Sequence, residues 1–309
     1  MKLNEKKLQS FALAELNTYD LRGLGICENK AVCEIQEDIV SNFDDLNSEE
    51  TKKARLDYFK VAGVTYDDYS EKHMRLDENR EIIYGIRNIG GNSNLPFINL
   101  IPNFEIESKE DALRIYENIK DDQRIFNPLY LCFHTNTKID ADFLGSLYMV
   151  ATTKSLKEKK AWPNEKSISF KEINDDSYYE WYKNGYDDFH SEFPELKTKV
   201  KVNSSDIMSV SLEQSLLKYV EFNGNRVGLI AAEKSNFLGH TASYFNEIFI
   251  SKKWKGKGLA KAIQRRFVEE FSEEDYVWGT IDSNNLPSYK TAYSNGRRPI
   301  RYECFINLN

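Results

Sequence analysis

The stretch that most constrains the fold runs from residue 243 to residue 271, where a strand-like run, a short loop and a helix-like run follow one another directly. The run SYFNEIFI (243–250) is rich in the aromatic and β-branched residues that favour strands. Apolar residues of the later segment recur every four positions: Leu259, Ile263, Phe267 and Phe271. A strand that leads through a tight loop into an amphipathic helix is a unit of sheets covered by helices. The sequence therefore predicts an α/β protein with a mixed sheet.

The rest of the second half supports this prediction. A half-buried strand is predicted over 167–173, an aromatic helix over 175–196, and a hairpin around Asn223-Gly224. After the loop and helix come a strand at 275–282, a short helix candidate and a last strand. The order β, α, α, β, β, β, loop, α, β, α, β is that of a mixed sheet with helices packed on it.

The lysine-rich stretch KSLKEKKAWPNEK (154–166) shows no strand pattern and contains Trp162-Pro163, so it marks a domain boundary. The prediction is a first domain over 1–155, a linker over 156–166 and a second domain over 167–309. Helices are expected in the first domain over 4–18, about 31–62 and 108–122, with strands between and after them.

A faint internal repeat relates the two halves. The segment NFEIESKEDALRIYENI, followed by LYLCFHTN, parallels NEIFISKKWKGKGLAKAIQRRFVEEF, followed by YVWGTIDSN, because both read as strand, helix and strand. The first copy lacks the glycine loop. This pattern predicts one degenerate duplication with a shared fold in both halves.

Composition restricts the partners and the location. The net charge of the 309 residues is -7, which argues against general nucleic-acid binding. No run reaches the ~18–20 apolar residues of a membrane helix, and the start of the chain lacks a signal-peptide pattern. The four cysteines form no C-x-x-C pair and the four histidines are scattered, so no metal site is expected. These features predict a cytoplasmic protein with reduced thiols and without membrane or nucleic-acid partners.

The loop before the helix has the properties of an anion site. A helix N-terminus presents backbone N–H groups without internal partners and carries the positive end of the helix dipole. Gly256 and Gly258 remove side chains that would block an approaching ligand, and they permit left-handed backbone angles. Lys253, Lys255 and Lys257 add positive charge. The natural ligand of such a loop is a phosphate or a diphosphate.

The stretch KGKGLA (255–260) resembles the pyrophosphate loop of the GNAT N-acetyltransferase superfamily, usually written Gln/Arg-x-x-Gly-x-Gly/Ala. Lys255 stands at the Gln/Arg position. Lysine departs from the family pattern there and keeps only the positive charge of the arginine. The run NEIFI before the loop resembles the central strand of the family, and DSNNLPSYKTAYSNG resembles its asparagine-bearing segment. The resemblance covers about 167–309. It implies the acyl-CoA N-acyltransferase fold and, with the repeat, two tandem GNAT-like domains of which the first is degenerate.

The resemblance implies acetyl-CoA as co-substrate, without a metal. The positions that it assigns to CoA binding lie on the strand end, the loop and the later asparagine: Phe249, Ile250, Ser251, Lys255, Gly256, Lys257, Gly258, Leu259, Ala260 and Asn285. The strand backbone is implied to pair with the pantetheine arm. Asn285 is alternatively a helix N-cap.

The resemblance also implies catalytic residues. Glu247 lies three residues before Ile250, where many members carry a glutamate that takes the proton of the amine; a strand carboxylate in a salt bridge is the alternative. The general acid is implied to be a tyrosine seven residues after the asparagine, but Ala292 stands there. Tyr293 and Tyr289 are the neighbouring candidates, and for both, packing under the last strand is the alternative.

Three further groups of side chains are candidates for contact with the acceptor or with the nucleotide of CoA. The aromatic row of helix 175–196 favours a core role, although part of it borders the acceptor groove of the resembling family. An acidic group, Asp187, Asp188, Glu192 and Glu195, would favour a cationic acceptor or form a solvated face. A basic group, Lys261, Arg265 and Arg266, would meet the adenosine phosphate of CoA or solvate the helix.

The predicted function is therefore transfer of an acetyl group from acetyl-CoA to a primary amine within a ternary complex. The acceptor is a small-molecule or peptide amine. One alternative is a non-catalytic acyl-CoA-binding or regulatory protein, which the missing general acid and Lys255 leave open. The other is a transferase with a doubled fold of this kind that uses aminoacyl-tRNA, against which the charge of -7 argues.

Overall fold

The computed structural model describes residues 4–194, 197, 200–271 and 275–308. Contacts divide the chain into two compact units, Met1–Leu147 with Ile300–Asn309 and Tyr148–Pro299. The first boundary lies before the linker that the sequence predicted at 156–166. The sequence analysis assigned the last strand to the second domain. In the structure, its residues from Ile300 onward belong to the first unit.

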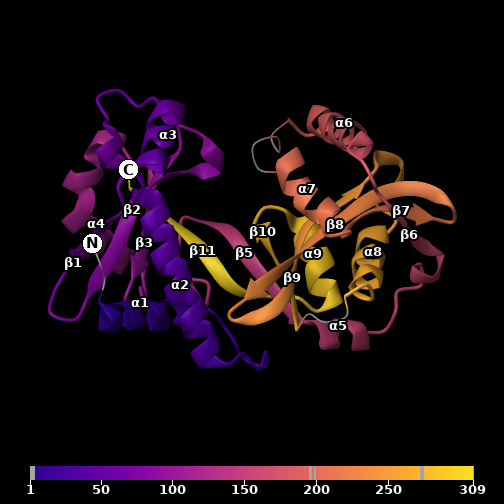
Figure 1. Cartoon of the computed structure of the whole chain (residues 1–309), viewed down its shortest axis with the longest axis horizontal. Helices are drawn as coiled ribbons and strands as arrows, with labels where there is room; N and C mark the ends of the chain where they lie inside the picture. Colours follow the sequence, from indigo (N-terminus) through magenta and orange to yellow (C-terminus); the bar gives the residue numbers. More distant parts are fainter. Residues whose placement is uncertain (1–3, 195–196, 198–199, 272–274, 309) are drawn as a thin grey trace. The chain divides into compact units, whose positions relative to one another are not determined.

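Unit 1 combines helices with strands of a mixed sheet. Its helices are α1 (Glu5–Asn17), α2 (Glu28–Asn47), α3 (Glu49–Phe59) and α4 (Lys109–Gln123). Its strands are β1 (Lys72–Arg75), β2 (Glu81–Asn88), β3 (Pro96–Pro102), β4 (Tyr130–Thr135) and the later part of β11 (Arg298–Asn307), in the order β1-β2-β3-β4-β11 (Figure 1). The strand β5 (Phe143–Thr152) begins in this unit.

The C-terminal strand joins unit 1 through an antiparallel ladder. Residues Tyr302–Asn307 of β11 pair with Tyr130–Thr135 of β4, so that Cys304 lies opposite Phe133. Cys304 and Phe133 are both fully buried in the core of unit 1. The hydrogen bonds and the core contacts together explain why the end of the chain belongs to the first unit.

The long helix expected over about 31–62 is wrong, because the chain forms α2 and α3 with a break between them. Ser48 has an extended backbone (ψ 146°), and its side chain accepts a hydrogen bond from the amide of Thr51 (3.1 Å). A serine in this role satisfies one of the free N–H groups at a helix start. The break therefore follows from an N-cap that the apolar pattern alone does not reveal.

Unit 2 contains the glycine loop. Its helices are α5 (Thr153–Glu158), α6 (Ser177–Glu192), α7 (Ser205–Glu213), α8 (Leu259–Val268) and α9 (Leu286–Asn295). Its strands are β6 (Ile168–Glu172), β7 (Leu217–Phe222), β8 (Asn225–Phe237), β9 (His240–Ile250) and β10 (Tyr276–Asp282), in the order β10-β9-β8-β7-β6, with β5 beside β10. The strands from β6 to β9 are antiparallel, whereas β10 runs parallel to β9.

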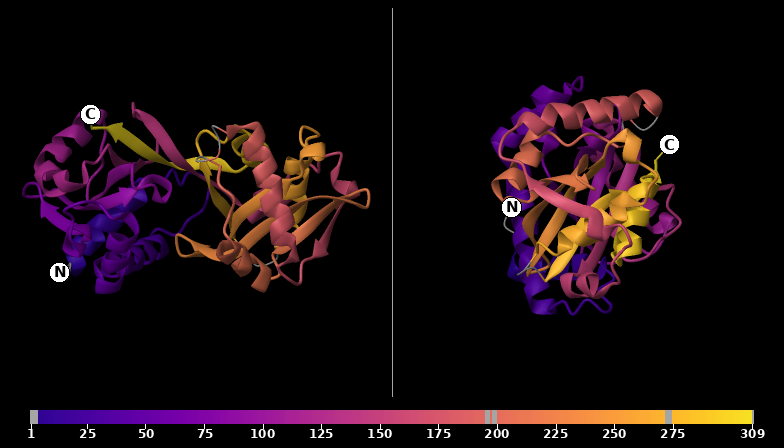
Figure 2. Two further views of the ribbon diagram at one scale, coloured as in Figure 1. Left: turned by 90° about the horizontal axis from the view of Figure 1, so that it is seen from above. Right: turned by 90° about the vertical axis from the view of Figure 1, so that its right-hand side faces the viewer.

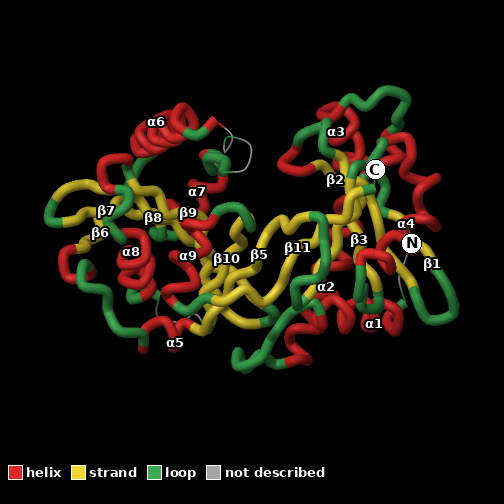
Figure 3. Tube along the Cα trace, turned by 180° about the vertical axis from the view of Figure 1, so that it is seen from behind, coloured by secondary structure: helices red, strands yellow, loops and turns green. Residues whose placement is uncertain are grey.

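Helices cover both faces of the sheet of unit 2. On one face, α6 and α7 pack on β7, β8 and β9 through a cluster that includes Tyr182, Met208 and Phe249, and Figure 2 shows α6 lying across these strands. On the other face, α8 packs through Ile263 and Phe267, with α9 beside it (Figure 3). The central strands of the sheet are therefore covered on both faces.

Both units contain the strand–helix–strand element that the repeat predicted. In unit 1, β3 and β4 are parallel neighbours with α4 between them in the chain, and in unit 2 the same relation holds for β9, α8 and β10. The mixed α/β fold class predicted from the sequence is confirmed. The helix α4 begins with Ser108 as N-cap and carries Glu110 and Asp111 in its first turn, charges that oppose an anion there.

Candidate functional site

The glycine loop joins β9 to α8 and has the backbone geometry of an anion cradle. Gly256 has φ +77° and Gly258 has φ +71°, both in the left-handed region that glycine adopts without strain. A Cβ on Gly256 would meet nothing within 4 Å, so the loop surface is open. Within the described part of the chain, no hydrogen bond uses the amide N–H of Gly256, Lys257 or Gly258. These amides and the first turn of α8 are therefore available to a ligand.

Aromatic rings and lysines surround the loop. Each of three lysine ammonium groups lies over a ring: Lys255 over Phe189 at 4.2 Å, Lys257 over Trp254 at 4.3 Å and Lys261 over Trp162 at 3.8 Å. Partial burial lowers the pKa of Lys255, and the carboxylates of Glu192 and Glu247 oppose that shift. Cation–π contacts hold the lysine stems while the charge stays near the loop. The loop thus has a positive field, as the sequence predicted.

The strands β9 and β10 part beside this loop. Their parallel pairing covers only Ala242 to Tyr244 on β9 and Tyr276 to Trp278 on β10. The later residues of β9, up to Ile250, pair with β8 alone among the described strands. A strand that loses its neighbour on one side presents unpaired N–H and C=O groups there. An extended ligand anchored at the loop could pair with this edge.

The three strand positions assigned to CoA binding are not equivalent. The amide of Ser251 donates to Val227 O on β8 at 2.9 Å, and the carbonyl of Phe249 also faces β8, only 2.0 Å from where a Cβ on Gly228 would lie. Alternate residues of an antiparallel ladder bond to the same neighbour. Of the three, Ile250 therefore directs its backbone toward the open side. The sequence pattern could not distinguish them.

Glu247 is the centre of a buried hydrogen-bond cluster on the α6 face. Its Oε2 accepts from the hydroxyls of Tyr182 (2.5 Å) and Tyr186 (2.8 Å), and its Oε1 accepts from the amide of Ile248 (2.9 Å). No cation is within ion-pair distance of this carboxylate among the described residues, so the salt bridge considered as an alternative is absent. Tyr182 in turn accepts a hydrogen bond from the amide of Asn203 (3.1 Å).

Burial raises the pKa of Glu247 above its ordinary value, although the hydrogen bonds from Tyr182 and Tyr186 oppose that shift. A carboxylate whose pKa is raised toward neutrality is a stronger base than an exposed one. Burial and the carboxylate also raise the pKa of both tyrosines well above the usual range, so they stay protonated and donate. This arrangement suits a general base.

A β-bulge and a glycine place Glu247 beneath α6. Ala231 lies opposite Glu247 and Ala232 opposite Phe245, so Asn246 is the additional residue in β9. Bulges of this kind re-aim side chains beside functional sites. Gly185 of α6 lies against Phe249, because a Cβ there would be 2.2 Å from the end of its ring. The close approach brings the tyrosines of α6 within reach of the carboxylate.

Tyr182 and Tyr186 contact Glu247 of the candidate site, whereas the sequence analysis assigned their row mainly to the core. Both belong to the aromatic row, and Tyr182 is fully buried as expected for a core residue. Their hydroxyls nevertheless meet a carboxylate from β9. The sequence feature that could have indicated this contact is the pair of tyrosines four residues apart, together with an acidic residue on a buried strand.

Of the two tyrosines considered as general acids, Tyr293 is exposed and Tyr289 is half-buried. Tyr293 is 58% exposed, and its ring stacks on that of Tyr289 with centroids 5.8 Å apart. Asn285 occupies the N-cap of α9, where its Oδ1 accepts from the amide of Ser288 (3.2 Å). The N-cap alternative for Asn285 is therefore present in the structure. No described contact joins either tyrosine to Glu247 or to the open edge of β9.

The basic residues of α8 have different roles. Arg265 is buried and pairs with Glu165 (2.7 Å), and it donates to the carbonyls of Lys157 and Lys159. The suggestion that Arg265 meets a nucleotide phosphate is wrong, because its guanidinium is used to hold residues 157–165 on α8. Lys261 remains close to the loop, over Trp162.

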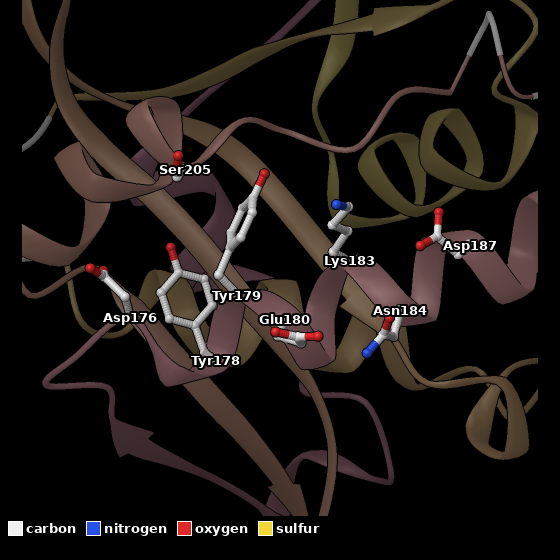
Figure 4. A pocket seen from close by; sticks show the side chains of 8 residues that line it. All are labelled: Asp176, Tyr178, Tyr179, Glu180, Lys183, Asn184, Asp187 and Ser205. Carbon is white, nitrogen blue, oxygen red and sulfur yellow. The ribbon is translucent and has the colours of Figure 1, made fainter.

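A hollow lined by Asp176, by residues of α6 and by Ser205 of α7 includes none of the residues of the glycine loop or of the Glu247 cluster. Figure 4 shows its lining: Asp176, Tyr178, Tyr179, Glu180, Lys183, Asn184, Asp187 and Ser205. Of the acidic group considered for an acceptor, Asp187 lines this hollow, Glu192 pairs with Lys252 (2.8 Å), and Glu195 lies outside the described residues. None of the predicted catalytic or CoA-binding residues lines it. We assign no role to the hollow.

No group of His, Cys, Asp and Glu in the described part of the chain has an arrangement suited to a metal ion. No described helix combines the length and the apolar run that crossing a membrane requires.

Comparisons with known proteins give likenesses only among solved structures. No protein-family model matches the chain, and no curated protein matches it. A GCN5-related N-acetyltransferase from Sphaerobacter thermophilus is 12% identical over 96% of this chain and 91% of that chain, with a TM-score of 0.46. A GNAT-family acetyltransferase from Colwellia psychrerythraea is 11% identical over 85% and 98%, with a TM-score of 0.44. A tandem GNAT protein from the clavulanic acid biosynthesis pathway is 11% identical over 84% and 95%, with a TM-score of 0.40. Likeness at this level concerns the fold, and activity has to be inferred from the residues of this chain.

Proposed function

We propose that the chain is a GNAT-type N-acetyltransferase in which unit 2 binds acetyl-CoA and acetylates a primary amine. The observation that carries the proposal is a juxtaposition on one strand. Among the described residues, the end of β9 leads into an open loop whose amides have no partner, and its edge beside β10 is unpaired after Tyr244. Glu247 lies between these two features. The loop amides suit the diphosphate of CoA, and the open edge of β9 suits its extended pantetheine arm. The carboxylate of Glu247 suits the acceptor amine.

The residues present fit CoA in three respects. Gly256 and Gly258 leave the backbone at the start of α8 uncovered, which suits a diphosphate. Ile250 directs its backbone groups to the side that β10 has left, which suits the amides of a pantetheine arm. Lys257 and Lys261 add charge beside the loop for the remaining phosphates.

Glu247 is proposed as the general base. Acetyl transfer requires a neutral amine, whose nitrogen attacks the thioester carbonyl carbon as its proton is removed. The carboxylate of Glu247 takes that proton, directly or through water, while Tyr182 and Tyr186 hold it in place. The acceptor is proposed to be a small-molecule or peptide amine.

Unit 1 is proposed to be a degenerate copy without CoA. The helix α4 has no glycine loop before it, and its first turn carries Glu110 and Asp111. These negative charges oppose a phosphate at that helix start. The active unit is therefore unit 2 alone.

The test is calorimetric titration of CoA into the wild type and into Gly258→Asp. Aspartate at a position with φ +71° strains the loop and adds a negative charge where the diphosphate is expected. We expect affinity to fall at least about 100-fold, since an ionic hydrogen-bond network of this size contributes roughly 3 kcal/mol. The control is Gly224→Asp, at φ +75° in the β7–β8 hairpin, which has similar strain but lies in a different loop. Equal CoA affinity in wild type and Gly258→Asp, or no CoA uptake by the wild type, would contradict the proposal.

Turnover separates the enzyme from a non-catalytic acyl-CoA-binding protein. Acetyl-CoA is supplied with a panel of small amines and lysine peptides, and released thiol is measured. We expect thiol release that depends on an amine and that is lost in Glu247→Gln. CoA binding without amine-dependent thiol release in every case would favour the binding protein.

A further inference from the structure

Arg297 is a buried cation of unit 2 for which the described residues provide no counter-charge. Its residue is 3% exposed, and its Nε is fully enclosed without a hydrogen-bond partner. No ion pair and no side-chain hydrogen bond is recorded for its guanidinium among the described residues. Arg265, which is similarly buried, has Glu165 at 2.7 Å. An unpaired buried charge destabilises a fold by several kcal/mol, so a ligand that completes the pair is the natural explanation.

The guanidinium of Arg297 lies where β9 and β10 part. Its centre is 4.9 Å from the ring centroid of Phe245, and Nη1 is 3.3 Å from the position that a Cβ on Gly279 would take. Phe245 and Gly279 are the residues directly after the last β9–β10 pair, Tyr244 with Trp278. Arg297 therefore occupies the vertex of the split between the two strands.

This vertex is on the same face as the loop and its helix. Phe245 packs with Phe267 and Phe271 in the cluster formed by α8, whereas Glu247 points to α6 on the other face. From Ile250 to Phe245 the strand advances five residues, about 17 Å at the usual rise per residue. An extended ligand anchored at the loop and laid along the open edge brings its far end to Arg297. In acetyl-CoA that end is the thioester.

We propose that Arg297 is a catalytic residue that neutralises the thiolate leaving from acetyl-CoA, an assignment that rests on the proposed function. The amine nitrogen forms a bond to the carbonyl carbon, and its proton passes to Glu247. The C–S bond then breaks, and its electron pair remains on sulfur as a thiolate beside the guanidinium. The thiolate later takes a proton from water. A fixed positive charge at the leaving group removes the need for a general acid, in agreement with the outward position of Tyr293.

The electrostatic surroundings of Arg297 are simple. Burial lowers its pKa to about 10, and among the described side chains Tyr244 opposes this shift. The hydroxyl of Tyr244 shares a 2.7 Å hydrogen bond with Thr280 Oγ1. Arg297 is therefore cationic at neutral pH, and no described carboxylate competes with a thiolate for it.

The experiment measures the ionisation of the thiol of bound CoA. CoA is titrated from about pH 6 to about pH 10 on the wild type, Arg297→Lys, Arg297→Gln and the surface control Lys290→Gln. The thiolate is followed by its near-ultraviolet absorbance, with desulfo-CoA as blank. We expect the thiol pKa on the wild type, Arg297→Lys and Lys290→Gln to be at least about one unit lower than on Arg297→Gln, a tenfold difference.

Two outcomes overturn the inference and differ from each other. If CoA binds and its thiol ionises equally on the wild type and Arg297→Gln, the role of Arg297 is wrong while the proposed function stands. If the wild type does not bind CoA, the proposed function fails and the inference fails with it.

A thermal melt distinguishes a structural arginine from a functional one. Because Arg297→Gln removes an unpaired buried charge, its midpoint of unfolding should be no lower than that of the wild type. A midpoint well below that of Lys290→Gln, or failure to fold, would show that the guanidinium is part of the packing and would overturn the inference.

Discussion

The hydroxyl of Tyr186 donates a 2.8 Å hydrogen bond to Oε2 of Glu247, although the two residues are 61 positions apart in the chain. Tyr186 belongs to α6 and Glu247 to β9, and the same oxygen also accepts from Tyr182. The contact links the helix that covers one face of the sheet to the strand that leads into the glycine loop. It provides several tests of the site.

Replacement of Glu247 by glutamine should stabilise the protein at neutral pH and abolish amine acetylation. Burial raises the pKa of this carboxyl in the folded state above its unfolded value. The folded protein therefore binds the proton more tightly, and stability falls as pH rises through the raised pKa. Each unit of that shift corresponds to about 1.4 kcal/mol, which the neutral amide recovers. Urea unfolding should show the gain at about pH 8 and lose it below about pH 4. A constant difference across this range would contradict the assignment.

Tyr186→Phe should move the acidic limb of the pH–rate profile to higher pH. The lost hydrogen bond favours the carboxylate form, so its removal raises the pKa of Glu247 further. The general base is then protonated over more of the neutral range. Tyr178→Phe is the matched control, because Tyr178 lies on the same helix and makes no described contact with Glu247. An unmoved limb in Tyr186→Phe would exclude Glu247 as the titrating base.

Gly185→Ala should destabilise the protein although alanine is the better helix former. Its Cβ would lie 2.2 Å from Phe249 Cζ, and that ring is held by Trp181, Tyr182 and Tyr186. Overpacking of this kind costs about 1–3 kcal/mol, more than the gain of up to about 1 kcal/mol in helix propensity. Asn184→Ala, at the exposed neighbouring position, should instead stabilise slightly. Thermal melts of both variants check the prediction, which fails if the two shifts have the same sign.

Glu165→Gln should weaken the fold and leave CoA affinity unchanged. The change leaves the buried guanidinium of Arg265 without its 2.7 Å partner, and breaking such a pair costs about 3 kcal/mol. Glu269→Gln is the control, since Glu269 meets the same guanidinium at 3.4 Å with its side chain 40% exposed, and its loss should cost well under about 1 kcal/mol. Urea unfolding measures stability and calorimetry measures CoA affinity. If folded Glu165→Gln loses CoA affinity, the purely structural role of Arg265 is wrong, and Arg265 contributes to nucleotide binding.

The sequence by itself determined the local elements and the loop. Spacing and composition located the helix that begins near Leu259, the strand before it and the glycines between, because these depend on neighbouring residues and on φ angles that glycine permits. The element order likewise indicated a mixed sheet and a doubled unit. The sequence suggests Glu247 as a candidate base only through the resemblance of its strand to a known family pattern.

The tertiary structure decided what depends on residues far apart in the chain. Whether β10 stays beside β9 or leaves it after Tyr244 is set by packing and register, which periodicity does not contain. The same holds for the tyrosines of α6 at Glu247, for Arg265 with Glu165, and for Arg297 at the split between the strands. Nothing in its own segment of sequence distinguishes any of these side chains. The contacts that distinguish it are made with residues that only folding brings close. The end of the last strand belongs to unit 1 for the same reason, because Tyr302–Asn307 pair with β4 of that unit and not with β10, the strand that precedes β11 in the chain.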